Sequence, residues 1–197
     1  MQVNLRRRFS QAISEGDGIS LIARVSAADV AARVEEQGAE AVLVAGSDDG
    51  ALAQIRNATS LPVLLAWPPD LGPPPPEADA CLLDVGEDLG SLAQLSGELS
   101  EACELAFRID DEEHLESALE ELDPEIFVLS AREADGEEAL EHVLDLLPDV
   151  PAGKLAIAEL SGTSRDDVGA LERAGFDGVI VEPRSVADLV GDAPPEV

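Results

Sequence analysis

Charged side chains stand at or near the ends of four short apolar segments, where α/β proteins commonly place groups that bind or react. They are Arg24, Arg108, Glu159 and Glu182. If the segments are parallel strands, their carboxyl ends meet and these side chains lie together. Two interpretations remain open. Either compensating ion pairs fill this region, because buried charges persist only when paired, or the arginines bind a small carboxylate or another anion, with Arg132 and Ser161 assisting.

The elements that would position these residues are short β-branched or leucine-rich segments that alternate with amphipathic helical ones. The predicted strands are Ile19–Val25, Ala41–Ala45, Pro62–Ala66, Ala80–Val85, Glu104–Ile109, Glu125–Ser130, Lys154–Glu159 and Gly178–Glu182. Eight is the strand number of a TIM barrel. After the third strand, residues 67–79 read WPPDLGPPPPEAD, and four successive prolines exclude a helix. We therefore expect an α/β fold, a (β/α)8 TIM-type barrel with a Pro-rich loop replacing the helix after strand 3.

The length and composition suit one domain. The 197 residues are 45% hydrophobic, enough for one sizeable core. We expect the barrel to occupy residues 1–190, with a helix inside residues 1–17 capping one end, and residues 191–197 to form a short tail. No segment approaches the ~20 apolar residues of a membrane span, and no apolar signal core follows the basic start. The sequence therefore predicts a cytoplasmic protein.

The charge balance is strongly acidic. The chain has 42 Asp and Glu against 12 Lys and Arg, for a net charge of −30, and Lys154 is its one lysine. The acids are spread over helical faces, so nucleic acid and anionic membranes would be repelled and are excluded as partners. Molar salt shortens the Debye length to about 3 Å and makes such a surface tolerable. We infer an extreme halophile; the alternative is an ordinary acidic protein from a genome that prefers arginine codons.

The cysteines and histidines of this sequence do not have the spacing of a metal site. Cys81 and Cys103 fall in an apolar segment and a helical pattern without CxxC spacing, so we expect buried, reduced thiols. His114 and His142 lie on acidic helical segments, where we expect them to be solvated. The sequence therefore predicts no metal site and no cofactor.

Two loops leave alternatives open. AGSDDG at residues 45–50 has the composition of a glycine-rich phosphate loop, but its aspartates oppose an anion and favour a turn with a helix cap. Trp67, beside the prolines, is expected to cover the side of the barrel from which a helix is missing. Alternatively, an exposed Trp67 anchors a protein partner. The uncovered side also leaves room for another chain, so the oligomeric state stays open.

The order of several segments resembles that of the indole-3-glycerol phosphate synthase family. The final third, LLPDVPAGKLAIAELSGTSRDDVGALERAGFDGVIVEP, resembles the end of that family, and FSQAISEGDGISLIARV resembles its amino-terminal helix and first strand. TSLPVLLAW, ELAFRIDDEEHLESALE and EIFVLSARE resemble the segments of the third, fifth and sixth strands. The resemblance covers nearly the whole chain and implies a barrel of the ribulose-phosphate-binding type.

The resemblance implies a lyase of tryptophan biosynthesis, which closes an indole ring on an anthranilate-bearing ribulose phosphate and needs a general acid, a general base and a phosphate site. Most of the family's residues are replaced. Ala66 stands where the family has its proton-donating lysine, and Arg108 stands where it has a glutamate. Glu182 and Pro183 replace its small phosphate loop. The positions that still match the family are Glu159, Ser161 and Gly162.

These replacements predict a non-catalytic relative of that family with a binding, regulatory or assembly role, and a small anionic ligand or a protein as its partner. The alternative is an active lyase whose acid and base are rebuilt from Glu159, Arg108 and Lys154. A third option is another phosphate-binding barrel, suggested by GAEAVLVAGSDDG and ADACLLD. Glu182 weakens both phosphate-dependent options, because a carboxylate 4 Å from a phosphate costs about 4 kcal/mol per charge pair at an effective dielectric of about 20.

Overall fold

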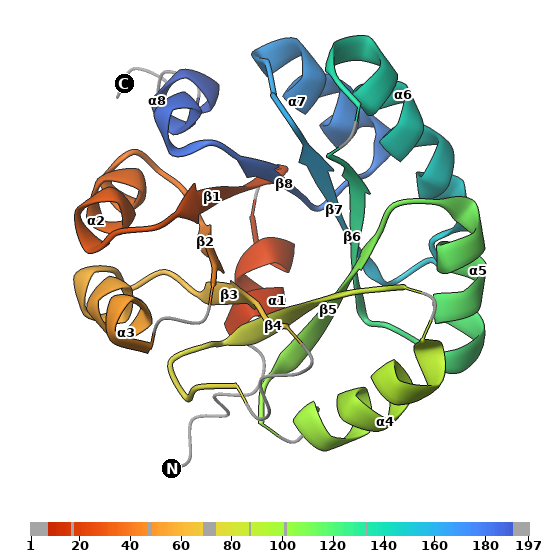
Figure 1. The fold of residues 1–197 in the computed structure, drawn as a ribbon. Helices are drawn as coiled ribbons and strands as arrows, with labels where there is room; N and C mark the ends of the chain where they lie inside the picture. The colour runs from red at the N-terminus through yellow and green to blue at the C-terminus, as the bar shows by residue number, and fades with distance from the viewer. Residues whose placement is uncertain are drawn as a thin grey trace.

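The computed structural model describes residues 8–16, 18–46, 49–68, 74–86, 88–100, 102–132 and 134–190. In this part of the chain, eight parallel strands pair in sequence order and close into a barrel when β8 pairs with β1 (Figure 1). The strands are β1 Ser20–Val25, β2 Ala41–Ala45, β3 Val63–Ala66, β4 Ala80–Asp84, β5 Glu104–Ile109, β6 Ile126–Ala131, β7 Leu155–Leu160 and β8 Gly178–Val181. The predicted (β/α)8 fold is confirmed.

Helices form an outer ring around the barrel (Figure 1). They are α2 Ala28–Glu36, α3 Asp49–Ala58, α4 Leu89–Leu99, α5 Glu112–Glu121, α6 Gly136–Leu146, α7 Arg165–Ala174 and α8 Val186–Leu189, with 3-10 turns η3 Leu147–Asp149 and η4 Pro183–Ser185. Between β3 and β4, the described residues 67–68 and 74–79 contain no helix, as the proline run predicted. The rest of that connection, residues 69–73, lies outside the described residues.

Local sequence signals explain where the helices begin and end. Asp111 precedes α5 and its carboxylate accepts a hydrogen bond from the backbone N–H of His114. Ser164 and Asp167 form a reciprocal capping box at the start of α7. Gly175 ends α7 with a φ of 107°, in the left-handed region that a side chain would disfavour. Of the AGSDDG segment, Asp49 and Gly50 begin α3, and residues 47–48 lie outside the described residues.

The barrel interior is apolar, and one helix closes its amino end. The inward-facing residues Ile22, Leu43 and Leu82 belong to a buried cluster that also contains Phe9 and Ile13 of α1 (Arg8–Ser14). Figure 1 shows α1 lying across the opening of the ring. The capping helix predicted inside residues 1–17 is therefore present over residues 8–14. Residues 1–7, together with the predicted tail at 191–197, lie outside the described residues.

A hydrogen-bonded pair fixes α1 to the barrel. The backbone N–H and the hydroxyl of Ser10 both donate to the carboxylate of Glu104, at 2.9 and 2.6 Å. Glu104 is the first residue of β5, so these bonds place α1 at the amino end of the strands. The opposite end, where the charged residues of interest lie, is left open for a functional site.

A second buried cluster fills the layer between the strands and the helices, and it contains Trp67, Cys81 and Leu83. Trp67 is only 7% exposed. Its backbone N–H donates to the carbonyl of Leu82 at 3.0 Å, which holds it beside β4 where the ring lacks a helix. The interpretation of Trp67 as an exposed partner anchor is therefore wrong, because its indole packs into this layer.

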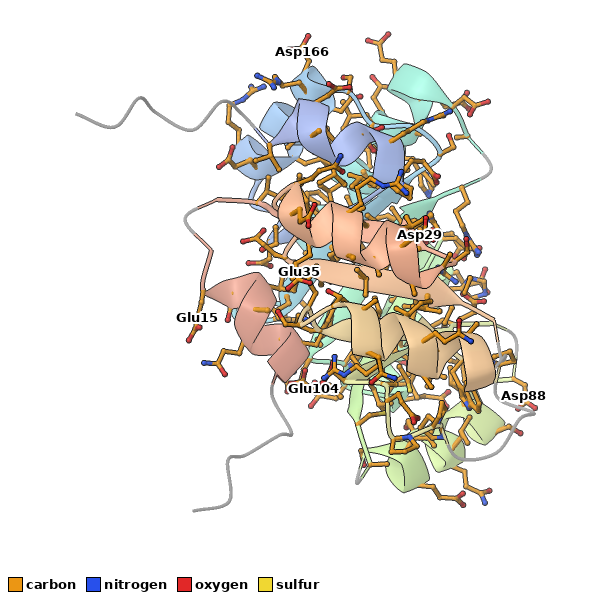
Figure 2. The ribbon with its side chains drawn as sticks, turned by 90° about the vertical axis from the view of Figure 1, so that its left-hand side faces the viewer. Glu15, Asp29, Glu35, Asp88, Glu104 and Asp166 are labelled. Atoms are coloured by element: carbon orange, nitrogen blue, oxygen red, sulfur yellow. The ribbon has the colours of Figure 1, made fainter. Side chains whose placement is uncertain are left out.

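Acidic side chains occupy the outside of the molecule on several different elements. Asp29 on α2, Asp88 before α4 and Asp166 on α7 are all exposed, and Figure 2 labels them at separate places on the surface. This agrees with the sequence-based distribution of acids over helical faces. None of the helices among the described residues combines the length and apolar character that a membrane crossing requires.

Candidate functional site

The carboxyl end of the barrel, called the mouth below, carries a group of charged side chains on the inward faces of the strands. Side chains alternate along a strand, so Arg24 follows Ile22 on the inner face of β1, and Asp84 follows Leu82 on that of β4. Strand register then sets the neighbours. Asp84 lies opposite Arg108 of β5.

Glu159 of β7 is the centre of this group. Its side chain is fully buried, with 0% exposure. Arg108 donates to it from Nε at 2.6 Å and from Nη2 at 3.2 Å, and Arg24 donates to it from Nη2. Arg108 is itself buried, with 7% of its side chain exposed. The carboxylate is therefore held between two guanidinium groups and is itself shielded from water.

The outer members of the group are more exposed and less tightly paired. Nη1 of Arg108 donates to Oδ1 of Asp84 at 2.7 Å, and Nε of Arg24 lies 3.5 Å from Oε1 of Glu182. Arg132 is 47% exposed and lies 3.8 Å from Asp84 and 3.9 Å from Glu159. These six residues are called the ion-pair network: Arg24, Asp84, Arg108, Arg132, Glu159 and Glu182.

The ion-pair network is electrically neutral, because three arginines face three carboxylates. A neutral network has no net attraction for a phosphate dianion, and any anion entering it would have to displace a carboxylate from its arginine partners. The structure thus brings together Arg24, Arg108, Glu159 and Glu182, as expected from the sequence. Whether this group binds a ligand stays a prediction.

Pairing determines the protonation of the two buried members. Burial acts to raise the pKa of Glu159, but the positive charges of Arg108 and Arg24 outweigh it and hold the pKa below the ordinary value of 4.5. For Arg108, burial acts to lower the pKa. The negative charge of Glu159 and the hydrogen bond to Asp84 outweigh burial, so the pKa of Arg108 is raised above its ordinary value. Both groups are therefore charged at neutral pH, and neither is poised to donate or accept a proton.

This pKa direction predicts how stability depends on pH. Because the folded-state pKa of Glu159 lies below 4.5, its pairing stabilises the protein fully above pH 4.5, and that contribution is lost as the pH falls through the lower folded-state value. Urea unfolding of the wild type and Glu159→Gln between pH 3 and pH 7, at one KCl concentration, should show a difference that shrinks below pH 4.5. A difference independent of pH would contradict an ionised Glu159.

Neither Ala66 nor Lys154 can supply general acid chemistry at the mouth. Ala66, at the position of the resembled family's lysine, packs against the inner apolar cluster and carries no ionisable group. Lys154 comes directly before β7, at the amino end of the barrel, and its Nζ lies 3.1 Å from Asp123 and 2.9 Å from Glu125. The suggested rebuilding of a catalytic site with Lys154 therefore fails, because the lysine is at the opposite end from Glu159.

Ser161 and Gly162 lie outside the ion-pair network. Both are exposed in the loop after β7, and Oγ of Ser161 lies 2.8 Å from the carbonyl of Ala134 and from Oδ1 of Asp135. A Cβ at Gly162 would meet no atom within 4 Å, so no close backbone approach requires glycine there. The expected help of Ser161 in anion binding is not apparent from its contacts, which hold one loop against another.

A hollow of about 680 Å³ opens beside β6 at the mouth. Its lining includes Ser130, Arg132, Glu138 and His142. Ser130 is 1% exposed, and its Oγ has no hydrogen-bond partner among the described residues. A buried hydroxyl without a partner is unusual and marks this hollow as the part of the mouth that could accept a polar group.

Both histidines contact the loop after β5, and His142 also lines this hollow. Nδ1 of His114 lies 2.9 Å from Asp110 and 3.1 Å from Asp111, and pairing with Asp110 raises the pKa of His114. Nε2 of His142 lies 2.7 Å from the backbone carbonyl of Asp110. Both histidines are half-buried, because the loop after β5 folds against them, and both keep part of their surface in contact with solvent, as the sequence predicted.

One group of side chains has ligand atoms close enough for a metal ion. Those of Asp110, Asp111 and His114 lie within 4.8 Å of one another. Helix capping accounts for this proximity, because Asp111 accepts the backbone N–H of His114 at 2.7 Å and so holds both residues at the start of α5. These contacts do not require a metal.

Asp84 is the member of the ion-pair network that sequence analysis missed. It ends the apolar segment ACLLD, and two-residue alternation places Ala80, Leu82 and Asp84 on one face. That alternation, applied to the predicted strand Ala80–Val85, would have found it.

Comparison with known proteins establishes the fold. No family model and no curated protein matches the chain. Among solved structures, thiamine phosphate pyrophosphorylase from Pyrococcus furiosus matches with a TM-score of 0.65 and 13% sequence identity, covering 87% of this chain and 93% of that one. The two share a barrel. At this identity the likeness concerns the fold alone, and the comparisons give no support for membership of the indole-3-glycerol phosphate synthase family.

Proposed function

We propose that this chain is a non-catalytic (β/α)8 barrel with a binding or assembly role, derived from an indole-3-glycerol phosphate synthase-like ancestor and working in the cytoplasm of a halophile. The observation that carries the proposal is the buried Glu159, held by Arg24 and Arg108. A catalytic carboxylate must exchange a proton or face a substrate, whereas this one has all its nearby charge compensated.

Three further features support the loss of catalysis. The inward position at the end of β3 holds Ala66, which can transfer no proton. Glu182 and Pro183 follow β8, where barrels of the phosphate-binding type use backbone N–H groups to hold the phosphate. Proline lacks that N–H, and Glu182 adds a negative charge. The ancestry itself is based on the order of the resembling sequence segments.

Ring closure is the activity to assay first. The purified chain, in about 2 M KCl so that its acidic surface is screened, is mixed with the anthranilate-bearing ribulose phosphate, and indole formation is followed by fluorescence. We expect a rate equal to that of buffer. A rate above buffer that disappears in Glu159→Gln would overturn the proposal and make the chain an active lyase.

Binding of a small carboxylate is the second candidate function. It is favoured by Arg132, the most exposed arginine of the ion-pair network, and by the buried hydroxyl of Ser130, for which the described part of the chain offers no hydrogen-bond partner. Both residues line the hollow. Asp110 and Glu138 line the same hollow, so its acidic wall disfavours a phosphate dianion more than a monocarboxylate.

Thermal unfolding separates a carboxylate site from a phosphate site. A ligand at about 100 times its Kd stabilises the folded state by about 2.7 kcal/mol, which corresponds to a Tm rise of about 5 to 10 °C for a chain of this size. We expect no rise with inorganic phosphate or pyrophosphate at constant ionic strength. A rise with acetate that is lost in Arg132→Gln would establish the second candidate, and a rise with phosphate would establish a phosphate-binding barrel.

A further inference from the structure

The chain has two cysteines, and the fold brings them together. Cys81 lies in β4, and Cys103 lies between α4 and β5. Their Sγ atoms are 3.2 Å apart, within S–H···S hydrogen-bond distance, although 22 residues separate them in sequence. Both side chains contribute to the layer between strands and helices. The mouth and its ion-pair network play no part in this contact.

The β4–α4–β5 unit explains why they meet. Cys81 pairs in register with Leu105 of β5, so Cys103 comes two residues before the partner of Cys81 on the neighbouring strand. The backbone N–H of Cys103 donates to the carbonyl of Leu99, the last residue of α4, at 3.2 Å. The contact between the two thiols therefore links β4 to the turn between α4 and β5.

Access to the two thiols differs. Cys81 is fully buried, with 0% exposure. Cys103 is half-buried and lines a cavity of about 870 Å³ at the amino end of the barrel, together with Ser96, Gly97 and Glu104. A small oxidant entering this cavity reaches the sulfur of Cys103 and is shielded from that of Cys81.

The contact also shifts the pKa values of the two thiols in opposite directions. The hydrogen bond with Cys103, together with burial, raises the pKa of the Cys81 thiol. The hydrogen bond with Cys81 lowers the pKa of Cys103 in spite of burial and the nearby charge of Glu104. The thiol with the lowered pKa is thus the one that lines the cavity, as expected of an attacking thiol, and the buried Cys81 lies beside it as a resolving thiol.

From this geometry we propose that Cys81 and Cys103 form a reversible intramolecular disulfide when the protein meets a hydroperoxide. The Cys103 thiolate attacks one oxygen of hydrogen peroxide, the O–O bond breaks, and the departing hydroxide takes a proton and leaves as water. Cys103 is then a sulfenic acid. Cys81 loses its proton and attacks the Cys103 sulfur, the S–O bond breaks, and a second water leaves. Two thiols are oxidised and one peroxide is reduced to two waters.

Little movement is needed to form the bond. A disulfide is about 2.05 Å long, so the sulfur atoms must approach by about 1.2 Å from their present 3.2 Å. We expect side-chain rotation to supply this shift while β4 and β5 stay paired. The disulfide would close a 22-residue loop around α4, which restricts the unfolded chain.

Mass spectrometry of the whole chain tests the proposal. The protein, in molar KCl, is treated with hydrogen peroxide, unfolded in urea and exposed to iodoacetamide. We expect a monomer about 2 Da lighter than the reduced chain, with neither thiol alkylated, and recovery of both thiols after dithiothreitol. The oxidised monomer should melt about 5 to 10 °C above the reduced one.

Two matched variants assign the order of events. In Cys81→Ser, Cys103 should stop at the sulfenic acid and be trapped by dimedone, because the resolving thiol is gone. In Cys103→Ser, the buried Cys81 should remain alkylatable after peroxide. Full alkylation of both thiols in peroxide-treated wild type, a disulfide only between chains, or oxidation only to sulfinic acid would each overturn the proposal. These results are independent of the ring-closure assay.

Discussion

Replacing Glu159 with glutamine is expected to lower the free energy of unfolding by about 3 to 5 kcal/mol. Glutamine has nearly the same shape, so the loss comes from removing one charge. Arg108, with 7% of its side chain exposed, then keeps its positive charge largely shielded from water, and its remaining partner is Asp84 at 2.7 Å. Urea unfolding followed by circular dichroism measures the change, since urea leaves the ionic strength unaltered.

Two controls decide whether the cause is the uncompensated charge. Glu182→Gln removes a carboxylate that is 46% exposed and 3.5 Å from Arg24, so it should cost less than about 1 kcal/mol. The double variant Arg108→Met/Glu159→Leu removes both buried charges together and should recover most of the lost stability, because apolar side chains of similar volume commonly replace a buried pair without cost. A double variant as unstable as Glu159→Gln would show that the pair has another function.

The barrel itself was predictable because its signals are local. Each strand is a short apolar segment bounded by turn residues, and the eight predicted strands agree with the observed ones to within one residue at each end. The proline run at residues 73–76 excludes a helix by removing backbone donors, whatever surrounds it. The count of eight then distinguished a closed barrel from an open sheet.

The site was only partly predictable because contacts across the barrel depend on register. The sequence placed Arg24, Arg108 and Glu159 at strand ends, but which guanidinium meets which carboxylate follows from how β1, β5 and β7 are staggered. Lys154 is a different case: the predicted strand Lys154–Glu159 already placed it at the amino end of the barrel, so its absence from the mouth could have been inferred from the sequence.

The contact between Cys81 and Cys103 illustrates a further limit. They are 22 residues apart and belong to no spacing motif, so only the pairing of β4 with β5 and the turn after α4 bring their sulfur atoms together. The two histidines are a similar case. His114 and His142 lie on separate helices, and both contact Asp110 because the loop after β5 folds between them.

Lowering the salt concentration is expected to destabilise the protein strongly, with Tm falling by about 10 °C between 2 M and 0.1 M KCl. The net charge of −30 is the cause. Two carboxylates 10 Å apart repel by about 0.4 kcal/mol in water, so a dozen such pairs add several kcal/mol. At 1 M salt the Debye length of about 3 Å removes most of this repulsion, while at 0.1 M it is about 10 Å and much of the repulsion returns.

A neutralised variant tests whether surface carboxylates are responsible. Glu116, Glu120 and Glu137 are exposed on α5 and α6, and replacing all three with glutamine should raise Tm at 0.1 M KCl while leaving it nearly unchanged at 2 M. Glu159→Gln should behave oppositely, with a loss of stability that salt does not repair, because ions screen a buried pair poorly. If the wild-type Tm hardly changes with KCl, the halophile inference fails and arginine-rich codon usage explains the single lysine.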